Sequence, residues 1–133
     1  MLTRRNVVSR VLVVEDDEAM RATLCQALER EGHRVLEQVS GDHVLALLES
    51  QAFDVIVLDR DLPGVNGLDL LPVLRRRFPR IAVIFITAFG GTRVAEEVIL
   101  LGAARYLEKP FRMQELLDAV LLATRPGGGT SGP

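Results

Sequence analysis

The sequence has a single cysteine, Cys25, and so it cannot form an internal disulfide bond. This usage is typical of a reducing compartment, and we expect a cytoplasmic protein in which Cys25 packs as a small buried side chain on a helix. No apolar run approaches the roughly 20 residues of a membrane span. The basic residues near the N-terminus are not followed by the apolar segment of a secretory signal. We therefore expect no contact with a membrane.

A large excess of charge of one sign is also missing, since the formal net charge is −2. This balance argues against direct binding of nucleic acid by this chain, and the arginines at 75–77 are explained as cations at the C-terminal end of a helix. Lysine is nearly absent, because Lys109 is the only one in the sequence. A single lysine among arginines indicates a position that needs a compact point charge. The following Pro110 makes a cis peptide bond available, which would aim this lysine inward.

What the sequence does contain is a regular alternation of apolar runs and helical patterns. Its length of 133 residues predicts one domain, with a flexible extension at 1–9 and a disordered Gly/Pro-rich tail at 125–133. The apolar runs predict strands at 11–14, 34–39, 54–59, 81–87 and 105–107. The helical patterns predict helices near 18–31, 44–48, 68–77, 94–101 and 116–121. Five strands alternating with five helices predict an α/β fold with a parallel sheet covered on both faces.

Two of the predicted helices carry local signals of their own. Ser40 or Asp42 is expected to cap the helix near 44–48, because short polar side chains accept hydrogen bonds from the first free amides of a helix. Pro72 falls inside the helix at 68–77. There it costs a backbone hydrogen bond unless that helix begins later than its apolar pattern indicates.

Polar residues stand where the predicted strands end. Glu15 and Asp16 follow the first strand, Asp59 ends the third, Thr87 ends the fourth, and Lys109 comes just after the fifth. Open parallel sheets bind ligands beyond the C-terminal ends of their strands. Taken singly, Asp59 could be a turn residue, Thr87 a β-branched strand residue and Lys109 a surface charge. Their common position predicts a site with three carboxylates, a hydroxyl and an ammonium.

The composition of this predicted site favours a metal ion. Carboxylate oxygens without cysteine or clustered histidine form a hard site that suits Mg²⁺ and is poor for zinc. A divalent cation together with Lys109 balances the charges of Glu15, Asp16 and Asp59. The next two acids, at 17 and 18, are explained as first-turn helix residues that interact with the helix dipole. We therefore predict a Mg²⁺ site in which Glu15, Asp16 and Asp59 tolerate one another.

In this order and spacing, the motifs resemble one known family. The acidic pair after the first strand, "VLDRDLPGVNG" after the third, "ITA" at the fourth and "YLEKPF" at the fifth are similar to the receiver domain of two-component response regulators. The resemblance covers about residues 10–123 and assigns 10–124 to one receiver domain. It implies a flavodoxin-like, doubly wound, five-stranded parallel sheet in the order 2-1-3-4-5 with five helices.

The resemblance also implies roles for the acidic residues. Asp59 resembles the phosphoacceptor, which takes a phosphoryl group from a histidine kinase or a phosphotransfer protein. Asp16 resembles a direct ligand of Mg²⁺ and Glu15 a residue that acts through water. Asp61 occupies the position whose backbone carbonyl completes the metal shell. The protein is then a signalling phosphoacceptor and no enzyme, apart from intrinsic self-phosphorylation and dephosphorylation.

The remaining residues of the resemblance form a switch. Thr87 should reorient to hydrogen-bond the phosphoryl group, and Lys109 should form an ion pair with it. Tyr106 matches the aromatic residue that moves inward as Thr87 moves. The face made by the fourth helix, the fifth strand and the fifth helix would then signal to an output domain or a downstream protein. A homodimer that forms on phosphorylation is compatible with this scheme.

Two alternative functions stay open at this point. A pseudo-receiver uses the same fold only for protein interaction, and it would leave Asp59 unmodified by Mg²⁺ and a small phosphodonor. The stretch "VIVLDRD" also resembles the motif of haloacid-dehalogenase-type phosphatases, with Asp59 as nucleophile and Asp61 as acid/base. Those enzymes carry the motif on their first strand and a further acidic pair late in the chain. Here the acidic pair precedes the motif, which disfavours this alternative.

Overall fold

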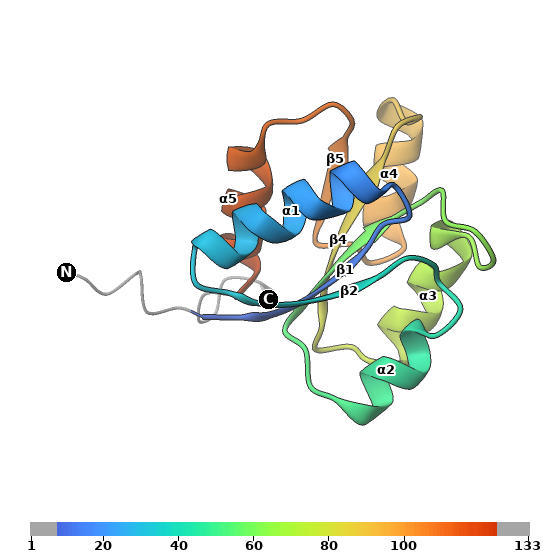
Figure 1. Ribbon diagram of the computed structural model, residues 1–133. Helices are drawn as coiled ribbons and strands as arrows, with labels where there is room; N and C mark the ends of the chain where they lie inside the picture. The colour runs from blue at the N-terminus through green and yellow to red at the C-terminus, as the bar shows by residue number, and fades with distance from the viewer. Residues whose placement is uncertain (1–7, 125–133) are drawn as a thin grey trace.

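The computed structural model describes residues 8–124, which form a five-stranded sheet between two layers of helices (Figure 1). The elements in chain order are β1 (Arg10–Val14), α1 (Glu18–Arg30), β2 (Arg34–Gln38), α2 (Val44–Ser50), β3 (Val55–Asp59), α3 (Gly67–Arg77), β4 (Ala82–Thr87), α4 (Thr92–Leu100), β5 (Arg105–Glu108) and α5 (Met113–Thr124). The tail expected at 125–133, and residues 1–7 of the expected extension, lie outside the described residues. Ser9 is buried, and its carbonyl accepts a hydrogen bond from the amide of Arg34.

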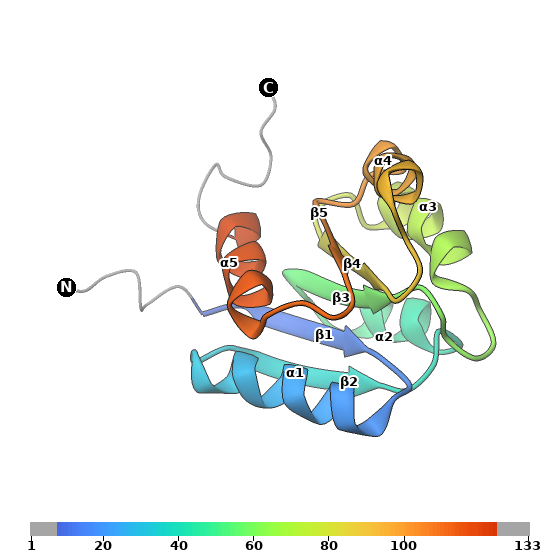
Figure 2. The same cartoon turned by 90° about the horizontal axis from the view of Figure 1, so that it is seen from above.

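The strands lie in the order β2-β1-β3-β4-β5, and all neighbouring pairs are parallel. This confirms the α/β fold class and the strand order that the resemblance implied. Val14 is level with Leu58, and Asp59 is level with Ile86. The arrowheads of β1 and β3 therefore end side by side (Figure 2). The residues that follow β1 are thus brought next to the end of β3.

The core has two parts because side chains of a strand point alternately to opposite faces. One part of the core faces α2, α3 and α4, and its strand residues are Leu12, Val14, Ile56, Leu58, Val83 and Phe85. The other part faces α1 and α5, and its strand residues are Val11, Val13, Val55, Val57, Ile84 and Ile86. Asp59 lies two residues after Val57 on the same strand, so its side chain points to the α1–α5 side of the sheet. Thr87 lies two residues after Phe85, so its side chain points to the opposite side.

Of the two helix signals read from the sequence, the expected cap of α2 is wrong, whereas the position of Pro72 inside a helix is confirmed. The N-cap of α2 is His43, which makes no side-chain cap hydrogen bond, so the expected cap by Ser40 or Asp42 is wrong. The Ser40 hydroxyl instead accepts from the amide of Asp42 in the preceding turn, at 3.3 Å. Helix α3 begins at Gly67, so a later start does not remove the conflict at Pro72, which lies inside the helix.

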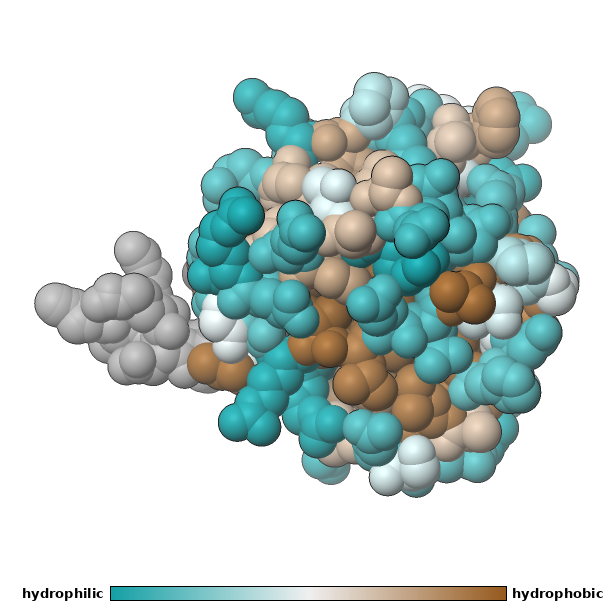
Figure 3. Space-filling model, viewed as in Figure 1, coloured by the Kyte–Doolittle hydropathy of each residue, from teal (hydrophilic) through white to brown (hydrophobic). Residues whose placement is uncertain are grey.

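Strand β2 is the edge of the sheet that is covered least. Its Leu36 and the following Val39 are exposed, while every residue of β3 is buried. Helix α2 is short, and Figure 3 shows apolar side chains gathered over β2 and α2.

Among residues 8–124, no helix has the length and apolar character needed to cross a membrane.

The single cysteine lies in the α1 part of the core. Cys25 is buried, and burial, followed by the charges of Glu37 and Glu29, raises the pKa of its thiol to about 11. The thiol is therefore protonated near neutral pH, where a reactive cysteine would need to be a thiolate. This agrees with its interpretation as a packing residue.

A buried histidine links the start of β1 to the start of β2. His33 accepts a hydrogen bond from the amide of Ser9 through its Nδ1 atom, at 3.1 Å. Burial lowers the pKa of His33 from its usual 6.5, although the nearby Glu31 acts in the opposite direction. The folded protein therefore favours neutral His33.

We expect this burial to make the free energy of unfolding depend on pH. Below about pH 6.5 the unfolded chain binds a proton that folded His33 excludes, so stability falls until the pH passes the lower pKa of the folded state. The loss is about 1.4 kcal/mol for each unit between the two pKa values. Urea unfolding at roughly pH 7.5 and pH 5.5 measures it. His33→Gln should reduce this pH dependence, whereas His43→Gln, at an exposed position, should retain it; equal dependence in both variants would contradict the expectation.

Candidate functional site

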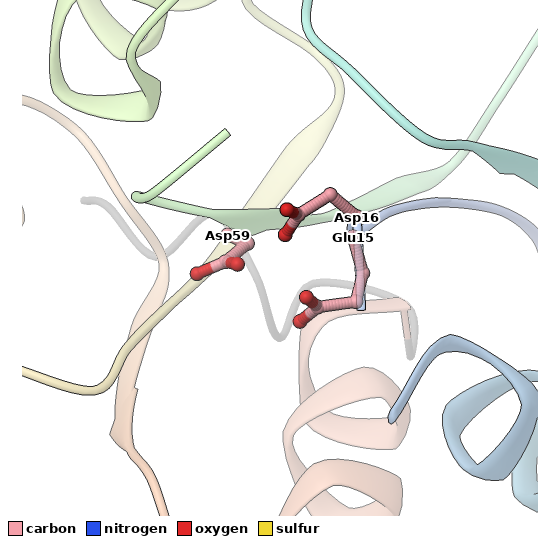
Figure 4. Close-up of side chains that lie close together, drawn as sticks. All are labelled: Glu15, Asp16 and Asp59. Atoms are coloured by element: carbon pink, nitrogen blue, oxygen red, sulfur yellow. The ribbon is translucent and has the colours of Figure 1, made fainter. Parts of the chain in front are cut away.

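Three carboxylates meet where β1 and β3 end. Oxygens of Glu15, Asp16 and Asp59 all lie within 4.8 Å of one another, and the side chains are drawn together in Figure 4. Glu15 and Asp59 are buried, at 0% and 2% exposed, whereas Asp16 is exposed to solvent. The three acids predicted from the sequence therefore form one cluster that opens to solvent on the side of Asp16.

Lys109 provides the positive charge of this cluster. Its Nζ lies 3.0 Å from Oε1 of Glu15 and 3.4 Å from Oδ2 of Asp59. Burial lowers the pKa of Lys109, but the hydrogen bond to Glu15 and the charge of Asp59 outweigh it and raise the pKa overall. The amide of Lys109 donates to the carbonyl of Thr87 at 2.8 Å, and the Lys109–Pro110 peptide bond is cis, as expected. The predicted lysine therefore reaches two of the three acids.

Glu15 is held in place by both its side chain and its backbone. Burial raises the pKa of Glu15 despite the two groups that stabilise its charge, the amide of Asp17 at 3.0 Å and Lys109. Arg21 on α1 donates to the carbonyls of Glu15 and Asp16 at 3.0 and 3.3 Å, and it also pairs with Glu37 at 2.8 Å. Helix α1 thus fixes the segment that carries the acids.

Asp59 ends β3 at a point where the chain turns tightly. The amide of Asp61 donates to Oδ1 of Asp59 at 3.4 Å, and the amide of Gly67 donates to the carbonyl of Arg60 at 2.9 Å. A Cβ atom at position 67 would lie 2.5 Å from the carbonyl oxygen of Asp59. Glycine at 67 therefore lets α3 begin directly against the strand end that carries Asp59. The side chain of Asp61 is exposed, and the role of its carbonyl stays a prediction.

Thr87 ends the strand beside the one that Asp59 ends, and its hydroxyl is bonded away from the acids. The residue is fully buried at the end of β4. Its hydroxyl accepts a hydrogen bond from the amide of Phe89 and donates one to the carbonyl of Phe89, both at 3.2 Å. Phe89 belongs to the β4–α4 loop, residues 88–91. The structure thus places Thr87 one position beyond the partner of Asp59 in the sheet, with its hydroxyl bonded to this loop.

Tyr106 on β5 contacts the same loop. It is half-buried, its hydroxyl donates to Oε1 of Glu108 at 3.4 Å, and the amide of Gly91 donates to the same oxygen at 3.2 Å. A Cβ atom at Gly90 would overlap the Tyr106 hydroxyl. Burial raises the pKa of Tyr106, and the charge of Glu108 raises it further. The predicted switch residues, Thr87 and Tyr106, therefore meet at the β4–α4 loop and not at the acids.

Two arginines of this region were not predicted from the sequence. Arg21 holds the backbone of the acidic pair, and Arg60 donates from Nη1 to the carbonyl of Phe89 at 3.0 Å. Both bind backbone carbonyls, and residue type does not reveal where a carbonyl will point. The only signal was the position of Arg60 directly after Asp59.

The arrangement has a defined chemical capacity. Its donors in the acidic cluster are all oxygens, which fits a hard divalent cation such as Mg²⁺ or Ca²⁺. Lys109 alone leaves this group of three acids with an excess of negative charge, so the cluster as described favours a further cation. Asp59 is a buried carboxylate beside an ammonium, in a cluster that opens to solvent at Asp16, and a carboxylate in such surroundings can act as a nucleophile.

Comparison with known proteins agrees with this geometry. The family model for the response regulator receiver domain matches residues 11–121. The response regulator protein FleR of Pseudomonas aeruginosa is 38% identical over 130 residues, which cover 96% of this chain and 28% of FleR. Sporulation initiation phosphotransferase F of Bacillus subtilis is 30% identical over 111 residues, which cover 84% of this chain and 90% of that protein. The chain thus spans less than a third of FleR.

Solved structures show the same fold. The receiver domain of the Francisella response regulator 1452 has a TM-score of 0.80 and 30% identity, covering 85% of this chain and 95% of that one. A Burkholderia pseudomallei response regulator, solved with a phosphorylated aspartic acid, a calcium ion and citrate, has a TM-score of 0.77 and 28% identity, covering 90% of this chain and 68% of that one. Strand order, acidic cluster and sequence similarity agree, and the chain belongs to the response regulator receiver domain family.

Proposed function

We propose that Asp59 is the residue at which this receiver domain is phosphorylated. The observation that carries the proposal is a buried carboxylate at the end of β3 that lies 3.4 Å from the Lys109 ammonium and shares a cluster with two further acids. The Burkholderia relative, which carries a phosphorylated aspartic acid, supports the same chemistry. We assign residues 10–124 to the receiver domain and expect it to act in the cytoplasm.

The transfer step follows from the carboxylate. An oxygen of Asp59 forms a bond to phosphorus, and the P–N bond of a phosphohistidine breaks, with its electron pair staying on the imidazole nitrogen. With acetyl phosphate a P–O bond breaks, and the electron pair leaves with acetate. Attack of water on the resulting acyl phosphate returns the carboxylate and inorganic phosphate. The domain is thus a phosphoacceptor with intrinsic self-phosphorylation and dephosphorylation at most.

The charges around Asp59 suit this step. Lys109 is close enough to neutralise part of the charge that develops on the phosphoryl oxygens. Glu15, Asp16 and Asp59 would hold Mg²⁺, together with the backbone carbonyl of Asp61. When bound, Mg²⁺ supplies further positive charge to the phosphoryl oxygens.

The signal would leave the site through Thr87 and Tyr106. Phosphorylation replaces one carboxylate charge by roughly −2 and adds acceptor oxygens. The Thr87 hydroxyl would then leave Phe89 for a phosphoryl oxygen, and Tyr106 would follow the β4–α4 loop inward. The surface of α4, β5 and α5 would change with them and signal to an output domain or downstream protein, either directly or through a homodimer. A histidine kinase or phosphotransfer protein would supply the phosphoryl group.

The sequence provides an internal probe for testing this function. Tyr106 is the only tyrosine and tryptophan is absent, so intrinsic tyrosine emission reports on Tyr106 alone. We expect Mg²⁺ with beryllofluoride to change this emission, and Mg²⁺ with acetyl phosphate to add one phosphoryl group by intact mass. A chelator should abolish both responses.

The alternatives give different results in the same experiment. A pseudo-receiver would show neither a mass change nor a change in emission. A phosphatase of the haloacid-dehalogenase type would instead turn over a phosphomonoester steadily and lose that turnover in an Asp61→Ala variant. Either result would overturn the proposed function.

A further inference from the structure

We propose that Arg60 is a positioning residue that holds the β4–α4 loop, and with it the Thr87 hydroxyl, in the unphosphorylated arrangement. We name the hydrogen bond from Arg60 Nη1 to the Phe89 carbonyl the Arg60 latch. The inference rests on the proposed function in one respect, namely that Thr87 is the group that turns to the phosphoryl oxygen.

The latch starts from a rigid anchor. The amide of Arg60 donates to the carbonyl of Ile86 at 2.9 Å, which continues the pairing of β3 with β4. Its carbonyl accepts from the amide of Gly67 at 2.9 Å. With both backbone groups fixed, the guanidinium projects from the end of β3 to the loop and meets the Phe89 carbonyl at 3.0 Å. The latch therefore joins the strand that carries Asp59 to the loop that moves in the switch.

The latch and Thr87 share one acceptor. The Phe89 carbonyl accepts from Arg60 at 3.0 Å and from the Thr87 hydroxyl at 3.2 Å. Either hydrogen bond holds the Phe89 carbonyl in a position where the second donor can also reach it. Once one bond has formed, the second one therefore costs less conformational entropy. Loss of Arg60 should therefore weaken the hold of Phe89 on the Thr87 hydroxyl.

The loop beyond Phe89 contributes little restraint. Gly90 and Gly91 follow, and Gly91 has a φ of +98°, in the region that favours glycine. Gly91 is also the N-cap of α4, so this helix begins without a hydrogen bond from a capping side chain. On this side the loop is held by the contact of its Gly91 amide with Glu108. Arg60 is thus an anchor at the end of the loop nearest Thr87.

One atom of Arg60 indicates that the latch is weak. Its Nε is buried and has no hydrogen-bond partner within residues 8–124. A buried donor without a partner is unfavourable and offsets part of what the Nη1 bond contributes. A guanidinium held this way restrains the loop without locking it, as a reversible switch requires.

The Arg60 latch should oppose beryllofluoride binding, because it belongs to the unphosphorylated arrangement. The latch is present in the arrangement in which Thr87 is bonded to Phe89, and that arrangement ends when Thr87 turns to a phosphoryl oxygen. Removing a contact that favours one arrangement shifts the population toward the other. Arg60→Met, which keeps the aliphatic stem, should therefore lower the beryllofluoride concentration at half-saturation by about fivefold, the lower end of typical coupling between sites.

The test is a titration of the full chain with beryllofluoride in Mg²⁺, followed by ¹⁹F NMR of the bound ion and by Tyr106 emission. The matched control is Arg80→Met, because Arg80 is exposed and precedes the opposite end of β4. In a Thr87→Ala background Arg60→Met should no longer shift the midpoint, since the group that Arg60 positions is gone. A merely structural role of Arg60 would leave the shift in place in that background and would contradict the proposal.

A second readout is independent of phosphoryl chemistry. The Phe89 amide donates to Thr87 Oγ1, so without beryllofluoride its exchange with water, measured by NMR, should be about fivefold faster in Arg60→Met. Unchanged exchange, or an unchanged or raised midpoint, would overturn the latch. If the wild-type chain bound no beryllofluoride while exchange still rose in Arg60→Met, the proposed function would fail and the latch would not.

Discussion

An Asp59→Asn variant is expected to take up no phosphoryl group from acetyl phosphate in Mg²⁺. The amide keeps the size of the side chain but lacks the anionic oxygen that attacks phosphorus. Intact mass spectrometry of the full chain measures the loss directly, and we expect it to be complete. Asp69→Asn, on the exposed first turn of α3, is the matched control and should be phosphorylated like the wild-type chain.

The same variant should remain folded, which separates lost chemistry from lost structure. The Asp59→Asn substitution leaves Lys109 paired with Glu15 at 3.0 Å and removes one of three clustered negative charges. In the absence of Mg²⁺ the free energy of unfolding should therefore equal or exceed that of the wild-type chain. Phosphorylation of Asp59→Asn at the wild-type level would show that another carboxylate is the acceptor, and peptide mapping would locate it.

Lys109→Met is expected to lower the free energy of unfolding by about 3 kcal/mol, because it leaves the fully buried Glu15 without its cation. This is a large share of the roughly 5–15 kcal/mol that stabilises a typical domain. Urea unfolding at neutral pH without added metal measures the change. Arg105→Met, at an exposed position of β5, should alter stability little.

A double variant identifies the cause of that loss. Glu15→Gln removes the charge that Lys109 balances, so Lys109→Met combined with Glu15→Gln should recover most of the lost stability. No recovery would mean that Lys109 stabilises the fold through the packing of its stem. A loss below about 1 kcal/mol in Lys109→Met itself would be typical of a surface ion pair and would contradict a buried one.

The sequence predicted best what depends on periodicity. Apolar strands ending in Glu15, Asp16 and Asp59 had to bring these acids to one edge, because parallel strands end together. The position of Thr87 at the end of its strand was predicted on the same ground. The direction of its hydroxyl was not predicted, because it depends on a hydrogen bond with the backbone of Phe89 in the loop that follows. Arg60 escaped prediction because its partner is a carbonyl 29 positions along the chain.

Local helix signals were less reliable than strand ends. Ser40 or Asp42 was expected to cap α2, but the Ser40 hydroxyl accepts from the amide of Asp42 in the turn before the helix. Pro72 stays inside α3, where Leu70, Leu71 and Leu74 are buried in the core. Burial of these side chains offsets the single hydrogen bond that proline removes, since each contributes roughly 1.5–3 kcal/mol. In α3, tertiary packing thus outweighed the preference of proline against helix interiors. At the start of α2, a hydrogen bond in the preceding turn replaced the expected helix cap.

The alternation of side chains along β3 and β4 has an evolutionary consequence. Asp59 lies on the same side of the sheet as the side chains that face α1 and α5, and Thr87 on the same side as those that face α2, α3 and α4. Under the proposed function, substitutions packed against α1 would alter how fast Asp59 gains and loses its phosphoryl group, whereas substitutions packed against α4 would alter the response that passes through Thr87. Duplicated genes would then diverge in the lifetime of the phosphorylated state and in the choice of partner through substitutions at separate positions.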